Sequence, residues 1–224
     1  MLDLSTCLSY YKNPAVQRAI VDASMNREIG VRFLKGHFGK RPQALFNPAD
    51  VFEFAKQGAS SFHVSEEHWT NPLSLNSTLS KKELEKLRIG WDLIIDVDCP
   101  DWDLSKRITA VIIKVLRQHG VQSVSCKFSG NKGFHVGVPF SAFPRVVLGK
   151  SASYLFPEGV KRILRYIAYY AEQYYSDEIL AGLQLSELSQ RLSLPKQELY
   201  RTVCAVCNKS VSVNSQKYDY FCTK

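Results

Sequence analysis

The hydrophobic pattern is most regular in the centre of the chain. Residues 93–97 form a mostly apolar run rich in branched side chains, which predicts a buried strand. Apolar residues then recur every three or four positions over 104–119, which predicts an amphipathic helix. Two further apolar runs, 122–128 and 134–138, predict strands joined by a turn at 130–133. This order predicts a helix on one face of a sheet and an open second face that can carry a site.

Shorter patterns flank this central unit on both sides. They predict helices at 14–26, 50–56, 158–175 and, as a broken pair, within 185–203. They also predict a strand at 29–34, a short apolar piece at 62–64 and a polar, mobile loop at 71–82. The clearest local signal is Asn13 followed by Pro14, an N-cap followed by a first-turn proline.

Composition narrows the class of protein. The chain has 224 residues, and its 45% hydrophobic content is enough for a packed core in one or two domains. No apolar stretch approaches the ~18 residues of a membrane span, and the N-terminus lacks the layout of a secretory signal. We therefore expect no membrane partner and a location inside the cell, in the cytoplasm, nucleoid or nucleus. With 29 Lys and Arg against 21 Asp and Glu, the net charge of +8 favours a polyanionic partner.

Two acidic residues close the first central strand. Asp96 and Asp98 lie two positions apart, so strand alternation sends both carboxylates to one face and Val97 to the other. Carboxylates this close repel each other unless a cation lies between them. Mg²⁺ and Mn²⁺ prefer oxygen ligands of this kind, and two such ions can hold a triphosphate for in-line phosphoryl transfer. The alternative is a solvated acidic strand end.

The second motif is SGNKGFH, residues 129–135. A short turn bracketed by glycines places backbone N–H groups close to an anion, and Lys132 adds a point charge at its tip. His135 begins the next strand and can face the same side as the two carboxylates. The alternative is an ordinary hairpin with Asn and Gly as turn formers.

Together the two motifs resemble the catalytic subunit of archaeo-eukaryotic DNA primase. GWDLIIDVD followed by KFSGNKGFHVGVP matches that superfamily in order and spacing. Its members, which include primase-polymerases and the polymerase domain of bacterial ligase D, carry two acids one residue apart at a strand end. A serine, a basic glycine-containing turn and a histidine follow. The resemblance covers residues 10–145 and implies an α/β (α+β) primase-type core with a mixed sheet and flanking helices.

The resemblance also implies a role for each residue of the two motifs. Asp96 and Asp98 would bind two catalytic Mg²⁺ or Mn²⁺ ions. The residues that would contact the nucleotide phosphates are Ser129, Gly130, Asn131, Lys132 and His135. Family members often carry two basic residues in this turn, and Asn131 occupies one of those places here.

Two basic segments near the N-terminus add further candidates. NREIGVRF resembles the family segment that lines the nucleotide site, which adds Arg27, Glu28 and Arg32; the alternative is a solvated helix end and strand. GHFGKR, residues 36–41, is too short for a phosphate-binding Walker loop and has no Ser or Thr after its lysine. It is either a basic loop near template or nucleotide or a solvated turn.

The C-terminal region predicts a metal module that is incomplete. Cys204-x2-Cys207 followed by Cys222 has the spacing of three ligands of a structural Zn²⁺ site; the alternative is three unrelated thiols. The primase family also has a third metal-binding aspartate on a later strand, and neither Asp177 nor Asp219 has a strand context in the sequence. We therefore expect the chain to be truncated, with the third carboxylate and the fourth zinc ligand after Lys224.

These observations predict three parts: a catalytic core at 1–150, a helical segment at 151–203 and the incomplete zinc module at 204–224. The expected function is that of a nucleotidyltransferase, a DNA primase catalytic subunit that makes short RNA primers from nucleoside triphosphates on a single-stranded DNA template. By resemblance its protein partner would be a large primase subunit. The alternatives are a primase-polymerase of repair or of a mobile element, and a non-catalytic zinc-containing fragment that binds nucleic acid.

Overall fold

Helices and strands are interspersed along the described part of the chain, which comprises residues 2–195, 211–214 and 219–222 of this computed structural model. The helices are α1 (Leu4–Tyr11), α2 (Pro14–Ser24), α3 (Pro48–Lys56), α4 (Lys81–Leu87), α5 (Trp102–Gln118), α6 (Glu158–Leu180) and α7 (Leu185–Leu192). The strands are β1 (Ile29–Phe33), β2 (Ala59–Val64), β3 (Glu67–Trp69), β4 (Arg88–Trp91), β5 (Leu93–Asp98), β6 (Ser125–Phe128), β7 (Gly133–Val138), β8 (Val146–Val147), β9 (Lys150–Ser151), β10 (Val211–Asn214) and β11 (Asp219–Cys222). This composition confirms the expected α/β (α+β) class. The mixed sheet expected with it is wrong for the described residues, because every strand pair there is antiparallel.

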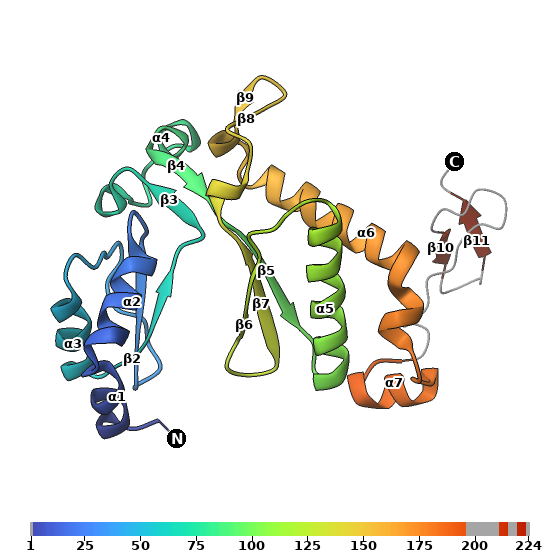
Figure 1. The fold of residues 1–224 in the computed structure, drawn as a ribbon, viewed down its shortest axis with the longest axis horizontal. Coiled ribbons are helices and arrows are strands. Elements are labelled where there is room, and N and C mark those ends of the chain that lie inside the picture. The colour runs from blue at the N-terminus through green and yellow to red at the C-terminus, as the bar shows by residue number, and fades with distance from the viewer. Residues whose placement is uncertain (1, 196–210, 215–218, 223–224) are drawn as a thin grey trace.

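The N-terminal unit is a pair of antiparallel strands backed by three helices (Figure 1). On one face of β1, Ile29 and Val31 are buried against α1 and α3, where they meet Val51 and Ala55. The opposite face is occupied by Arg32, which is exposed, and by Gly30. Strand alternation therefore separates an apolar face, which holds the helices, from a polar face that is open to solvent.

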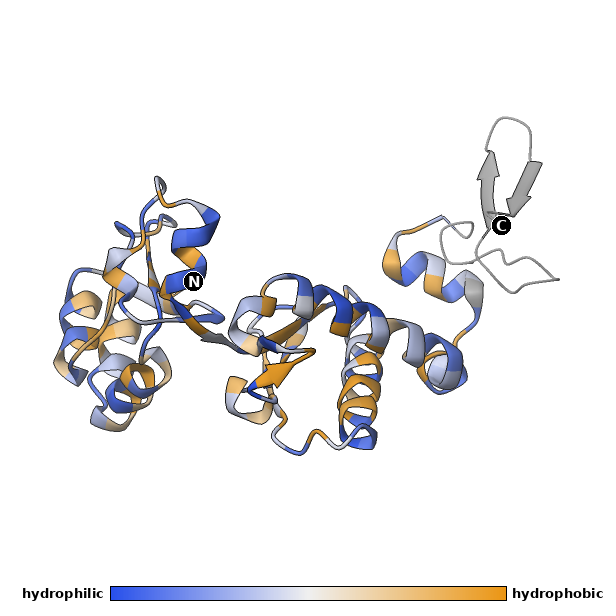
Figure 2. Ribbon diagram, turned by 90° about the horizontal axis from the view of Figure 1, so that it is seen from above, coloured by the Kyte–Doolittle hydropathy of each residue, from blue (hydrophilic) through white to orange (hydrophobic). Residues whose placement is uncertain are grey.

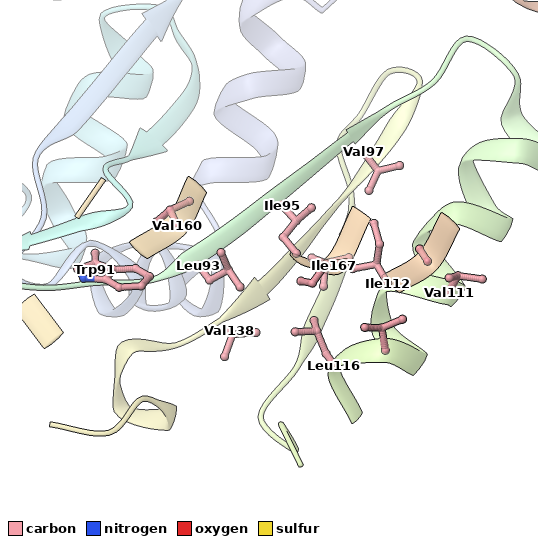
Figure 3. Packing of buried hydrophobic residues seen from close by; sticks show 13 residues of the cluster. Trp91, Leu93, Ile95, Val97, Val111, Ile112, Leu116, Val138, Val160 and Ile167 are labelled. Atoms are coloured by element: carbon pink, nitrogen blue, oxygen red, sulfur yellow. The ribbon is translucent and has the colours of Figure 1, made fainter. Parts of the chain in front are cut away.

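The central unit is a three-stranded antiparallel sheet in the order β5-β7-β6. Its buried face packs against α5 and α6, and Figure 3 shows Val97 and Leu93 of β5 among the apolar side chains of these helices. Val115 and Leu116 of α5 are almost fully buried there. Burying one such side chain contributes about 1.5–3 kcal/mol, so this core fixes the position of β5 and of the residues on its other face.

The polar joint between the two units is formed by β3, β4 and the residues next to them. β3 follows β2, and it pairs with β4, which leads directly into β5. The apolar residues of the N-terminal and central units form two separate clusters, and Figure 2 shows the units as distinct bodies with a narrow connection. The two units therefore have separate cores.

Several elements differ from the expectations, each for a local reason. The pattern misses α1 because its Ser- and Thr-containing sequence has low helix propensity, although Asp3 caps it by accepting a 2.7 Å hydrogen bond from the Thr6 amide. The polar loop expected over 71–82 ends earlier, because Ser80 and Glu83 form a capping box that begins α4 at Lys81.

The remaining differences concern element ends. β6 begins at Ser125, three residues later than expected, and α6 continues to Leu180 instead of ending at 175. α7 is the first of the two helices expected within 185–203, and residues 196–203 lie outside the described residues. Among the helices that the structure describes, none is both long and apolar enough to cross a bilayer.

Candidate functional site

The two candidate metal-binding carboxylates lie on the open face of the central sheet. Asp96 and Asp98 are both exposed, whereas Ile95 and Val97 between and beside them are buried on the opposite face. The strand is held straight by full pairing with β7 from Leu93 to Asp98. The two carboxylates therefore project from a rigid strand in the arrangement that the sequence predicts.

The sheet register brings the second motif next to the first. His135 on β7 is paired with Asp96 on β5, and its Nε2 lies 3.5 Å from Asp96 Oδ1. On the other side of β7, His135 is paired with Lys127 on β6. Residues paired across strands share a face, so Asp96, His135 and Lys127 form a row across the open face.

The 129–133 turn is held in shape by its own serine. Ser129 Oγ accepts a 3.2 Å hydrogen bond from the Gly133 amide, and the Ser129 amide donates a 2.9 Å hydrogen bond to the Gly133 carbonyl. Gly130 has φ +94°, a conformation that favours glycine. Gly133 is paired with Asp98, so the turn, with Asn131 and Lys132 at its tip, lies at the end of β5 that carries the carboxylates.

Arg32 approaches this row from the N-terminal unit. It lies on the open face of β1, and His63 of β2 lies on the same face. Burial, together with the charges of Arg32 and Lys127, lowers the pKa of His63 below its ordinary value. Because a charge shifts a pKa in this way at short range, Arg32 of the N-terminal unit and Lys127 at the edge of the central sheet both lie near His63.

Arg27 and Glu28 form ion pairs in and beside the polar joint. Arg27 donates a 2.8 Å hydrogen bond to the Ser65 carbonyl and pairs with Asp92. Glu28 is 4% exposed and accepts hydrogen bonds from both the Nε and Nη2 atoms of Arg41. Asp92 lies between β4 and β5, four residues before Asp96 and about 13 Å away at the rise of a strand. Arg27 therefore contacts the chain just before β5 and not the carboxylate row.

Asp92 is a functional candidate that the sequence patterns do not reveal. Its carboxylate receives a 2.9 Å hydrogen bond from the Phe140 amide, lies 3.0 Å from His68 Nε2 and pairs with Arg27. Burial alone would raise the pKa of this carboxyl, but hydrogen bonds from His68, Arg27 and Phe140 and the Arg27 charge bring the pKa to about 2. The one signal for Asp92 in the sequence is that an acidic residue lies between two apolar residues, Trp91 and Leu93.

We expect Asp92→Ala to lower the free energy of unfolding by about 3 kcal/mol, because it leaves Arg27 partly buried without its partner. In the wild type, the folded-state pKa is depressed below the unfolded value, so the stabilisation is complete above about pH 4. It is lost as the pH falls toward 2, and it amounts to about 2 kcal/mol. Urea unfolding at pH 7 and at pH 3 measures both effects. Equal unfolding free energies for the variant and the wild type at pH 7 would contradict this role.

The two carboxylates suit a hard divalent cation that completes its coordination with phosphate oxygens and water. Mg²⁺ is usually held by one or two carboxylates together with substrate phosphates and water, and Asp96 and Asp98 provide two carboxylates on one exposed face. Within the described part of the chain, no group of three His, Cys, Asp or Glu side chains is arranged to hold a metal ion.

The zinc prediction falls outside what the structure describes. Cys204 and Cys207 belong to residues 196–210, which lie outside the described residues, and Cys222 ends β11, where the backbone alone is described. The ligand set expected from these three cysteines stays a prediction.

Comparison with known proteins adds one partial similarity. No protein-family model matches the chain. The uncharacterized protein MJECS07 of Methanocaldococcus jannaschii is 34% identical to it over 61 residues, which are 27% of this chain. The match covers 14% of that relative's length, so it links this chain to a small part of a longer protein, and the relative's name states no activity.

Proposed function

We propose that this chain is the catalytic core of a primase-type nucleotidyltransferase, which joins nucleoside triphosphates on a single-stranded DNA template to make short primers. The observation that carries the proposal is the pairing of β5 with β7. Two motifs that lie more than thirty residues apart in the sequence meet there, with His135 opposite Asp96 and Gly133 opposite Asp98. A solvated strand end and an ordinary hairpin, taken separately, give no reason for this juxtaposition.

The chemistry would be in-line displacement at phosphorus. A 3′-hydroxyl attacks the α-phosphorus of the incoming nucleotide, the new P–O bond forms as the bond to the β-phosphate oxygen breaks, pyrophosphate leaves, and the hydroxyl proton passes to solvent. Mg²⁺ or Mn²⁺ on Asp96 and Asp98 would supply neutralisation of the phosphate charge. His135, paired with Asp96, and Lys132, at the tip of the adjoining turn, would hold the triphosphate through charge and hydrogen bonds. Catalysis would rest on positioning and on charge stabilisation.

The partners follow from the same proposal. The net charge of +8 suits a strand held through its phosphates, and a large primase subunit is the protein partner that the sequence resemblance implies. A structural Zn²⁺ on the C-terminal cysteines belongs to the proposal as well.

The direct test supplies the full chain with a single-stranded template, the four ribonucleoside triphosphates and Mn²⁺. We expect a ladder of short products on a denaturing gel that requires both template and metal ion. A parallel reaction with deoxynucleotides distinguishes a primase from a primase-polymerase. If no product forms while the chain still binds the template, the non-catalytic nucleic-acid-binding alternative is the better description.

A further inference from the structure

The open face of the N-terminal sheet and the loop after β1 carry several exposed cations, and Glu28, the acid next to them in the sequence, is already paired with Arg41. In the sequence no Asp or Glu occurs between Ile29 and Ala49, or within β2. The same segments contain Arg32, Lys35 and Lys40, all exposed. Lys127 lies on β6, the edge strand on the side of the central sheet that faces β2 (Figure 1), and its charge contributes to lowering the pKa of His63 on β2. The charge pattern suits a polyanion.

An exposed aromatic ring lies at the centre of this surface. Residues 37–41 turn back along β1, where the Gly39 amide donates a 2.8 Å hydrogen bond to the Val31 carbonyl and Phe38 forms an isolated bridge with Arg32. This places the Phe38 ring over Gly30 and edge-on to His63, with ring centroids 5.2 Å apart. Although it packs there, Phe38 remains 52% exposed.

The arrangement differs from that of an ordinary solvated loop. The loop is pinned to β1 by backbone hydrogen bonds on both sides of its turn, from the Gly36 amide to the Phe33 carbonyl and from the Phe33 amide to the His37 carbonyl. Cations near an exposed aromatic ring are the features by which proteins hold single-stranded nucleic acid, through phosphate contacts and base stacking.

From these observations we infer that the surface formed by Arg32, Lys40, Phe38, His63 and Lys127, here called the basic face, binds single-stranded DNA, with the cations on its phosphates and a base stacked on Phe38. The inference rests on the proposed function, for which it assigns the template a surface. The row Lys127–His135–Asp96 would lead the strand from the basic face to the carboxylates.

The test measures binding apart from synthesis. A 5′-fluorescein-labelled oligodeoxythymidylate of twenty nucleotides is titrated with the full chain, with EDTA and without nucleotides, and fluorescence anisotropy is followed between 50 and 200 mM salt. We expect Arg32→Gln and Lys40→Gln each to weaken binding about fivefold and to flatten the slope of log K against log salt by about 0.7. Phe38→Ala should weaken binding about tenfold, and Phe38→Tyr should restore it.

Arg162→Gln is the matched control, because Arg162 is an exposed cation on α6, outside the basic face. Unchanged binding by Arg32→Gln, Lys40→Gln and Phe38→Ala overturns the inference, and so does an equal loss in Arg162→Gln, which would indicate diffuse attraction. Full competition by millimolar ATP also overturns it, because the phosphates recognised would then be those of the nucleotide. If circular dichroism shows that Phe38→Ala does not fold, the binding of Arg32→Gln and Lys40→Gln decides between the two outcomes.

These readouts separate the inference from the proposed function. Failure of primer synthesis with intact, mutation-sensitive binding refutes the catalytic proposal and retains the basic face. Synthesis that proceeds normally in Arg32→Gln and Phe38→Ala retains the catalytic proposal and refutes the basic face as its template surface.

Discussion

Replacing Asp96 and Asp98 together by asparagine is expected to abolish template-dependent synthesis, by about 10³-fold or more, because the two carboxylates would be the protein's ligands for the catalytic ions. The same variant should be as stable as the wild type or slightly more stable. Both side chains are exposed on one face, and the change removes the repulsion between them. The measurements are product formation with Mn²⁺ and urea unfolding of the same preparations.

Asp22→Asn is the control for this experiment, since Asp22 is an exposed aspartate of α2 in the N-terminal unit. It should leave synthesis unchanged. Retention of synthesis by the double variant would remove the catalytic assignment, and a loss of synthesis accompanied by unfolding would show that the carboxylates have a structural role instead.

Gly133→Ala is expected to have the largest effect of any single substitution near the site. A Cβ atom at this position would lie 1.8 Å from the Val97 carbonyl oxygen, so β5 and β7 would have to separate beside Asp98. We expect a loss of about 3 kcal/mol in the free energy of unfolding, together with a loss of synthesis, because the separation displaces Asp98 from the turn. Chemical denaturation and the primer assay measure the two effects.

Gly120→Ala is the control that separates the steric clash at Gly133 from the general effect of replacing a glycine. Gly120 has a left-handed φ of +82°, unlike Gly133, and a Cβ there meets no atom within 4 Å. This substitution therefore carries conformational strain without a clash and should cost about 1 kcal/mol. If the two alanine variants were equally stable, the close approach of β5 and β7 at Gly133 would not be a determinant of the fold.

The central unit was predictable because its signals are local. The alternation through Asp96, Val97 and Asp98 and the helical spacing of α5 both follow from burial on one side. The sequence also predicted the α2 start, where Asn13 caps the helix by accepting a 2.9 Å hydrogen bond from the Ala15 amide. The β3–β4 pair was not predictable, because its three- and four-residue strands are too short to show a period.

The residues of the candidate site also differ in whether their signal is local in the sequence or depends on long-range contacts. Asp96, Asp98 and His135 belong to contiguous motifs, and the sequence identified them. Asp92 and Phe38 acquire their surroundings from segments distant in the chain: His68 and Phe140 for the first, and His63 for the second. No sequence spacing relates these positions to their partners, so their contacts could not be predicted from the sequence.

The polar joint at Asp92 has a mechanical consequence. Because each unit has its own apolar core and the Asp92 contacts between them are hydrogen bonds and an ion pair, a rotation of one unit against the other breaks no shared hydrophobic packing. Such a joint would allow the units to move as a hinge does. In the proposed function, the distance from Arg32 and Phe38 on the N-terminal unit to Asp96 and Asp98 on the central unit could then change as a strand advances, while both cores stay intact.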